Sequence, residues 1–148
     1  MAGINIIIAR DLRKRYGELR AVDGISFEVR RGEIFGMLGP NGAGKTTTVE
    51  ILEGMRKADS GTATVNGHDV ATDVKAVKST IGVQLQSAAF FDHLRLTEII
   101  SLFADCYGAR VDARAALDRV GLAEKASSFY PPLSGGQKQR LSIAVALV

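Results

Sequence analysis

The chain has 148 residues, which is enough for one domain with its own core and too few for two. Hydrophobic residues make up 46% and charged residues 24%, a composition typical of a globular protein. The formal charge of +3 is mild, and the N-terminal basic residues are interleaved with Asp11, Glu18, Asp23 and Glu28. This pattern favours a solvated strand edge over a nucleic-acid surface, so we expect no nucleic-acid partner.

The single cysteine, Cys106, excludes an internal disulfide framework and suits a reducing compartment. No apolar run approaches the roughly 18 residues of a membrane span. Residues 4–9 are apolar, but the run is short and lacks the cleavage context of a signal peptide. We therefore expect a cytoplasmic protein, which can still dock onto a membrane partner.

The N-terminal region is predicted to be β. Residues 4–8 are mostly β-branched, Gly17-Glu18 is turn-like, and residues 25–29 alternate with one buried face. A second turn falls at residues 30–32. Residues 33–38 are then predicted to form a buried strand that leads into a glycine-rich loop.

The glycine-rich loop fits the phosphate-loop pattern G-x-x-x-x-G-K-[ST] between a strand-like and a helix-like run. Gly42 and Gly44 let backbone N–H groups close around phosphate oxygens, and the following helix adds the positive end of its dipole. Lys45 can reach the terminal phosphates, and the Thr46 hydroxyl can ligate Mg²⁺. The predicted nucleotide-binding residues of this loop are Gly39, Pro40, Asn41, Gly42, Ala43, Gly44, Lys45, Thr46 and Thr47.

After the loop, the sequence predicts alternating helices and strands, as a layered α/β domain requires. A helix over 45–53 ends at Gly54, and a turn at 59–61 leads into a strand over 62–65. Asn66-Gly67 is a strong hairpin signal. A short helix over 73–79 and a strand over 81–85 follow.

The next part is predicted to be mainly helical. Thr97 can cap a helix that runs to Tyr107 and ends at Gly108, and Asp112 can cap another that ends before Gly121. Phe103 and Tyr107 are four residues apart, and such a stripe is more often core than a ligand surface. We expect Cys106, in the same helix, to be a buried small hydrophobe.

A second candidate site lies near the C-terminal end of the sequence, where Ser134 and Gln137 form the S-x-x-Q capping box of a helix start. Gly135 and Gly136 occupy the first turn, although each glycine costs about 1 kcal/mol there relative to alanine. A structural cap alone does not need them, whereas a helix start that an anion approaches closely does. The segment is either a plain cap or a second phosphate-binding element.

Together, the two motifs resemble the ATP-binding subunit of ABC transporters. Residues 133–137 match that family's LSGGQ signature letter for letter, and residues 39–47 match its Walker A loop. The resemblance implies an α/β P-loop NTPase of the ABC ATPase type, here a partial domain over 1–148. Residues 1–85 would form the core with Walker A, and residues 86–148 the helical subdomain with the signature. Residues 32–39 most resemble the daunorubicin and multidrug-export subgroup.

The resemblance also implies the ligands, ATP and Mg²⁺, and the residues that meet them. Tyr16 is placed where the family stacks an aromatic ring on adenine, and Gln86 where it joins Mg²⁺ to the membrane-domain contact; Thr46 is the other implied Mg²⁺ ligand. The alternatives are a packed aromatic and an exposed polar side chain. The residues implied to meet the nucleotide of a partner domain are Ser134, Gly135, Gly136 and Gln137.

The implied assembly is a head-to-tail homodimer or heterodimer of ATP-binding domains, joined to a membrane-spanning permease subunit. It would lie on the cytoplasmic face of the cell membrane and power export of a drug or lipid-like substrate. Two alternatives remain: a soluble ABC-family ATPase without a transporter, and a nucleotide-binding fragment without hydrolytic activity.

The sequence departs from the family pattern at its end. It stops at Val148, before the acidic residues of the family's Walker B strand and its switch histidine, and we expect both His68 and His93 to be surface residues. No catalytic residue is therefore assigned, and we expect hydrolysis by these 148 residues alone to be weak or absent. The strand ending at Leu38 would also have an unpaired apolar edge.

Overall fold

The computed structural model describes residues 4–84 and 89–148. The chain divides into two compact units, Met1–Ile81 and Gly82–Val148. Each unit has its own hydrophobic core. Within the described residues, none of the helices is both long and apolar enough to cross a membrane.

A long β-hairpin forms one side of the first unit and confirms the β prediction for the N-terminal region. Strands β1 (Asn5–Tyr16) and β2 (Leu19–Arg30) pair in antiparallel fashion around the Gly17-Glu18 turn. A register shift between Ala9 and Leu12 accompanies the positive φ of Asp11, 47°. Because this bulge interrupts the alternation of side chains, Ala9 and Leu12 are both fully buried although they are three residues apart.

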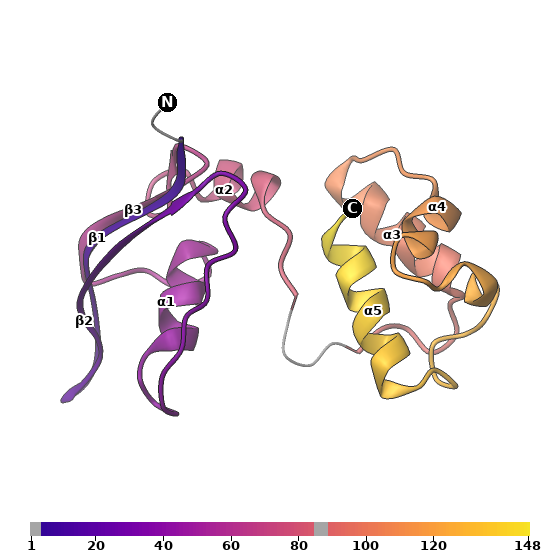
Figure 1. Cartoon of the computed structure of the whole chain (residues 1–148), viewed down its shortest axis with the longest axis horizontal. Coiled ribbons are helices and arrows are strands. Elements are labelled where there is room, and N and C mark those ends of the chain that lie inside the picture. Colours follow the sequence, from indigo (N-terminus) through magenta and orange to yellow (C-terminus); the bar gives the residue numbers. More distant parts are fainter. Residues whose placement is uncertain (1–3, 85–88) are drawn as a thin grey trace. The chain divides into compact units, whose positions relative to one another are not determined.

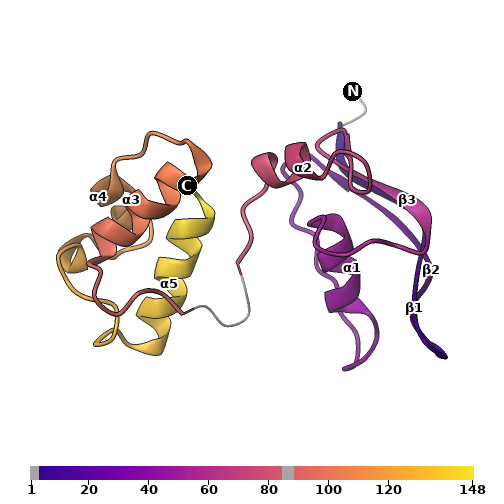
Figure 2. The ribbon, with the colours of Figure 1, turned by 180° about the vertical axis from the view of Figure 1, so that it is seen from behind.

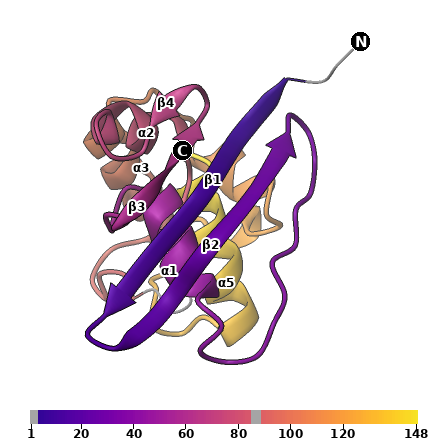
Figure 3. The ribbon, with the colours of Figure 1, turned by 90° about the vertical axis from the view of Figure 1, so that its left-hand side faces the viewer.

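The sheet of the first unit has the strand order β2-β1-β3-β4 and is antiparallel throughout. Strands β3 (Ser60–Val65) and β4 (His68–Asp69) flank the expected Asn66-Gly67 turn. Helices α1 (Lys45–Leu52) and α2 (Val74–Thr80) lie on one face of the sheet (Figures 1 and 3). The core between these layers consists of Ala9, Leu12, Val22, Ile51, Ala63, Val65, Val70 and Val77.

Two strand predictions are wrong for the described residues. Residues 33–38 form no strand, and residues 81–84 of the expected 81–85 strand form none either. Ile34 is fully exposed and Leu38 is 95% exposed, whereas Phe35 stacks on Phe27 with ring centroids 5.0 Å apart. A β-ladder needs a neighbour for its N–H and C=O groups, and the sheet assembled from the described residues places none beside these segments.

The second unit is helical, as predicted (Figure 2). It contains α3 (Leu96–Tyr107), α4 (Ala113–Asp118), the short 3₁₀ helix η1 (Ala123–Lys125) and α5 (Gly135–Ala146). Asp112 caps α4, because its carboxylate accepts hydrogen bonds from the N–H groups of Arg114 and Ala115 at 2.9 and 3.2 Å. The core consists of Leu96, Ile99, Ile100, Ala104, Leu117, Leu122, Ala126, Tyr130, Leu133, Leu141 and Ala144.

Helix α3 corrects three expectations. It begins two residues earlier than expected, because Arg95 and not Thr97 is the cap residue. The Arg95 N–H donates to Glu98 Oε2 at 2.6 Å. Cys106 is exposed, and Tyr107 is 65% exposed, so neither belongs to the core. The packed stripe of this helix ends at Ala104, one turn before its C-terminus.

Candidate nucleotide-binding site

The phosphate loop joins residues 33–38 to helix α1 in the first unit. Gly42 and Gly44 have φ angles of 83° and 79°, in the left-handed region that favours glycine. The N–H of Ala43 donates to the Pro40 carbonyl at 3.3 Å, and the N–H of Thr48 donates to the Gly44 carbonyl at 2.8 Å. The chain therefore turns tightly and enters α1 directly at Lys45.

Gly44 is held against strand β2 more closely than any other residue type would allow. A Cβ atom on Gly44 would lie 1.9 Å from the carbonyl oxygen of Ala21. Ala21 belongs to β2, whose first residue, Leu19, pairs with Tyr16 across the hairpin. The contact thus places the loop beside the end of the hairpin that carries Tyr16.

The N-terminus of α1 is open to an anion. Gly44 is its cap residue and has no side chain to accept a hydrogen bond from the first turn, and that turn contains no acidic residue. The four N-terminal amides of a helix lack intrahelical partners, and they carry the positive end of its dipole. The terminus can therefore donate several N–H groups to one anionic ligand.

The Lys45 ammonium lies within this loop. Its Nζ donates to the carbonyl oxygens of Gly39 and Pro40, both at 2.7 Å. These contacts hold the ammonium at the loop backbone without neutralising its charge, because a carbonyl carries no formal charge. The positive charge expected from the sequence is thus held at the loop, where a phosphate oxygen would meet it.

The Mg²⁺ ligands expected from the sequence are only partly described. Thr46 is exposed in the first turn of α1, where its hydroxyl can act as a single oxygen ligand. Gln86 lies outside the described residues. Among residues 4–84 and 89–148 no group of three or more His, Cys, Asp or Glu side chains could enclose a metal. One hydroxyl suits an ion that arrives with phosphates and water, as Mg²⁺ commonly does.

Tyr16 lies at the end of β1 and is 40% exposed, so its ring is available to a ligand. Arg56 Cζ lies 5.3 Å and Lys14 Nζ 5.8 Å from its ring centroid. Arg56 in turn is paired with Glu50 of α1. Sequence reasoning missed Arg56, because no helix or strand rule pairs residues that are six positions apart.

The signature segment lies in the second unit and begins α5. The Ser134 N–H donates to Gln137 Oε1 at 2.9 Å, and the Gln137 N–H donates to Ser134 Oγ at 3.3 Å, which confirms the capping box. Leu133 is buried in the core of this unit, whereas Gly135 and Gly136 are exposed. Among the residues that the structure describes, a Cβ atom at either glycine would meet no atom within 4 Å, so no described neighbour requires glycine there.

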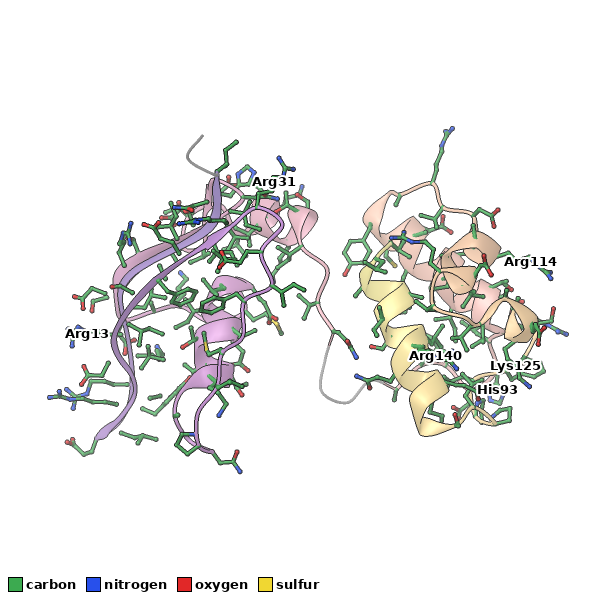
Figure 4. All side chains as sticks on the ribbon, viewed as in Figure 1. Arg13, Arg31, His93, Arg114, Lys125 and Arg140 are labelled. Carbon is green, nitrogen blue, oxygen red and sulfur yellow. The ribbon has the colours of Figure 1, made fainter. Side chains whose placement is uncertain are left out.

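Several charged residues of the hairpin pair with one another. Arg13 projects from the face of the sheet opposite α1 (Figure 4), where it bonds to Asp11 and Asp23 at 2.9 and 2.6 Å. Arg10 pairs with Glu28 and, mainly through their hydrogen bond, lowers the pKa of that carboxyl. His93 is exposed as expected, and His68 is half-buried beside Asp73, with Nδ1 and Oδ2 2.8 Å apart.

Comparison with known proteins identifies the family. The family model described as ABC transporter matches residues 22–148. The chain belongs to the ABC transporter family. ATP-binding domains of this family are generally ATPases, and the α/β fold expected from the two motifs is confirmed.

Individual relatives of this ABC transporter chain agree with that assignment. The linearmycin resistance ATP-binding protein LnrL of Bacillus subtilis is 38% identical over 95% of this chain and 47% of its own length. The daunorubicin resistance ATP-binding protein DrrA3 of Streptomyces coeruleorubidus is 39% identical over 91% of the chain and 44% of its own length. A spermidine/putrescine import ATP-binding protein of Pseudomonas aeruginosa is 40% identical over 94% of this chain and 39% of its own length.

A solved structure of an ATP-binding subunit of an ABC transporter superposes with a TM-score of 0.81 at 27% identity. The superposed region covers 95% of this chain and 60% of the solved chain. The chain thus spans about half the length of the curated relatives that it matches.

Proposed function

We propose that this chain is the nucleotide-binding part of the ATP-binding subunit of an ABC exporter. The observation that carries the proposal is the open N-terminus of α1, with the Lys45 ammonium held at the loop and no acidic residue in the first turn. A triphosphate satisfies both the amides and the ammonium. Membership in the family makes ATP the natural nucleotide.

In this proposal the loop residues 39–47 hold the phosphates and Tyr16 stacks on the adenine. Mg²⁺, when bound, neutralises charge that develops on the phosphates. Thr46 supplies one oxygen ligand to it and Gln86 a second. The exposed Thr46 hydroxyl at the start of α1 supports the first of these assignments.

Ser134, Gly135, Gly136 and Gln137 would meet the ATP held by a second ATP-binding domain, in a head-to-tail dimer of identical or different chains. The support is the open space around Gly135 and Gly136, two glycines that weaken a helix start without relieving any contact with the described residues of this chain. Glycines there let a phosphate approach the N–H groups of α5 closely.

The transport partner would be a separate membrane-spanning subunit, with this chain on the cytoplasmic face of the membrane. Export is favoured by the resemblance of residues 32–39 to the drug-export subgroup and by relatives named for linearmycin and daunorubicin resistance. A relative named for polyamine import is equally similar, so sequence identity alone does not set the direction.

Isothermal titration with ATP tests the phosphate-binding claim. Lys45→Ala removes the charge at the loop, and a charge-assisted hydrogen bond of about 1.5–3 kcal/mol predicts that the dissociation constant rises by roughly tenfold or more. Lys75→Ala is the matched control, because Lys75 is exposed on α2 in the same unit. Equal affinity of the Lys45→Ala and control variants would refute the proposal.

A second variant tests the role given to the signature. Ser134→Arg blocks the start of α5 and should leave ATP binding to the monomer unchanged, while abolishing any dimer that ATP induces in sedimentation experiments. Loss of ATP binding by the monomeric variant would contradict a site on a partner domain.

A further inference from the structure

The Tyr16 ring is held by a side chain that the phosphate-loop motif does not include. The guanidinium carbon of Arg56 lies 5.3 Å from the ring centroid, inside the distance at which a cation is attracted by an aromatic face. Arg56 Nε also donates to Glu50 Oε2 at 2.6 Å. The Arg56 and Glu50 side chains are 37% and 29% exposed, so solvent screens this pair only partly.

The position of Arg56 follows from the way α1 ends. Gly54 takes φ 65°, and the N–H groups of Met55 and Arg56 both donate to the Glu50 carbonyl, at 2.9 and 3.1 Å. The chain therefore folds back over the last turn of α1, which brings the Arg56 side chain to the Glu50 carboxylate. Because α1 begins at the phosphate loop, this arrangement links Tyr16 to the same helix that would bind the phosphates.

A second cation near the ring is neutralised in the same way. Lys14 Nζ lies 5.8 Å from the Tyr16 centroid and donates to Asp59 Oδ1 at 2.6 Å, and Asp59 Oδ2 accepts the Arg15 N–H at 2.7 Å. Each cation is thus paired with a carboxylate. A cation that is paired with a carboxylate attracts a phosphate only weakly. We therefore expect Lys14 and Arg56 to influence the position of the Tyr16 ring and not the binding of the triphosphate.

We propose that Arg56, held by Glu50, is a positioning residue for nucleobase binding: it fixes the Tyr16 ring so that one face stacks on the base. This inference rests on the proposed function, because it needs Tyr16 to meet a base. It adds a specificity role for a residue of the turn after α1 and separates base recognition from phosphate recognition. A purely structural role for Arg56 predicts no difference between ligands with and without a base.

The test compares binding of ATP and of inorganic tripolyphosphate by calorimetry. Arg56→Gln should weaken ATP binding by about threefold to tenfold, the range expected of one cation–π contact, and leave tripolyphosphate binding unchanged. Arg56→Lys should recover part of the ATP affinity. Arg20→Gln is the matched control, since Arg20 pairs with Asp23 on the same hairpin but is not among the cations found over the Tyr16 ring.

Tyr16→Ala should weaken ATP binding by at least as much, and the double variant should add nothing further, because Arg56 acts through the ring. Equal losses for both ligands, no loss, or tighter ATP binding in Arg56→Gln would overturn the inference. These outcomes are distinct from failure of the proposed function, which would appear as an unchanged affinity for both ligands in Lys45→Ala.

Discussion

Replacing Gly44 by alanine should be far more costly than the same change at Gly42, two residues earlier in the loop. Both residues have left-handed φ angles, 79° and 83°, and this alone costs a side chain about 1–2 kcal/mol. At Gly44 the new Cβ would also lie 1.9 Å from the Ala21 carbonyl oxygen, whereas at Gly42 it meets no atom within 4 Å. Relieving such a backbone clash adds about 1–3 kcal/mol. We therefore expect Gly44→Ala to lose about 2–5 kcal/mol and Gly42→Ala about 1–2 kcal/mol.

The assay is urea denaturation followed by the NMR signals of β1, β2 and β3, which report on the unit that contains the loop. Gly42→Ala serves as the control, because it shares the backbone conformation and lacks the contact. If the two variants lose the same free energy of unfolding, the close approach of the loop to β2 does not constrain Gly44, and the reasoning fails.

Two further predictions concern single carboxylates. Asp112→Ala should lower the unfolding free energy of the helical unit by about 1 kcal/mol, because it removes the side-chain cap of α4, while Asp112→Asn should change it by only a few tenths; urea denaturation measures both. The pKa of Asp59 is lowered from its ordinary value of 3.8, chiefly by the Lys14 hydrogen bond and then by the Arg15 N–H. Its stabilising contribution is therefore complete above pH 3.8 and lost as the pH falls through the lowered pKa, and a carboxyl NMR titration of Lys14→Met should move the midpoint back up.

Local chemistry was enough to predict most helix and turn positions. The ends of α1 and α3 were found from Gly54 and Gly108, and the start of α4 from Asp112, because caps depend on residues close in sequence. The β3–β4 hairpin followed from Asn66-Gly67 for the same reason. Such signals act over a few residues and need no knowledge of the rest of the fold.

The wrong predictions share a different cause. Residues 33–38 have a strand-like composition, but a strand is completed by a neighbour, which the local sequence cannot specify. Tyr107 continues the apolar stripe of α3 but lies beyond the residues that pack against the rest of the unit. In each case the pattern was recognised correctly, and long-range packing decided the outcome.

The candidate site divides in the same way. The phosphate loop and the capping box of Ser134 and Gln137 are contiguous in sequence, so their local geometry could be predicted. The roles of Tyr16 and Gln86 remain predictions, since they rest on register alone. The contact of Tyr16 with Arg56 joins two segments forty residues apart and became visible only in the structure.

The two cores should also differ in how fast they form. The core of Gly82–Val148 joins α3 to α4, the next helix, and to α5 about 40 residues further on, whereas the sheet of Met1–Ile81 must bring Ile7 to Val65, 58 residues away. Closing that longer loop costs entropy before any contact repays it, so contact order favours earlier folding of the helical unit. During synthesis, however, the unit that folds more slowly leaves the ribosome first, because the sheet of Met1–Ile81 is N-terminal to the helical unit. During translation the phosphate-loop unit therefore has time to fold before the helical unit is complete, whereas in refolding from denaturant both units begin to fold at once.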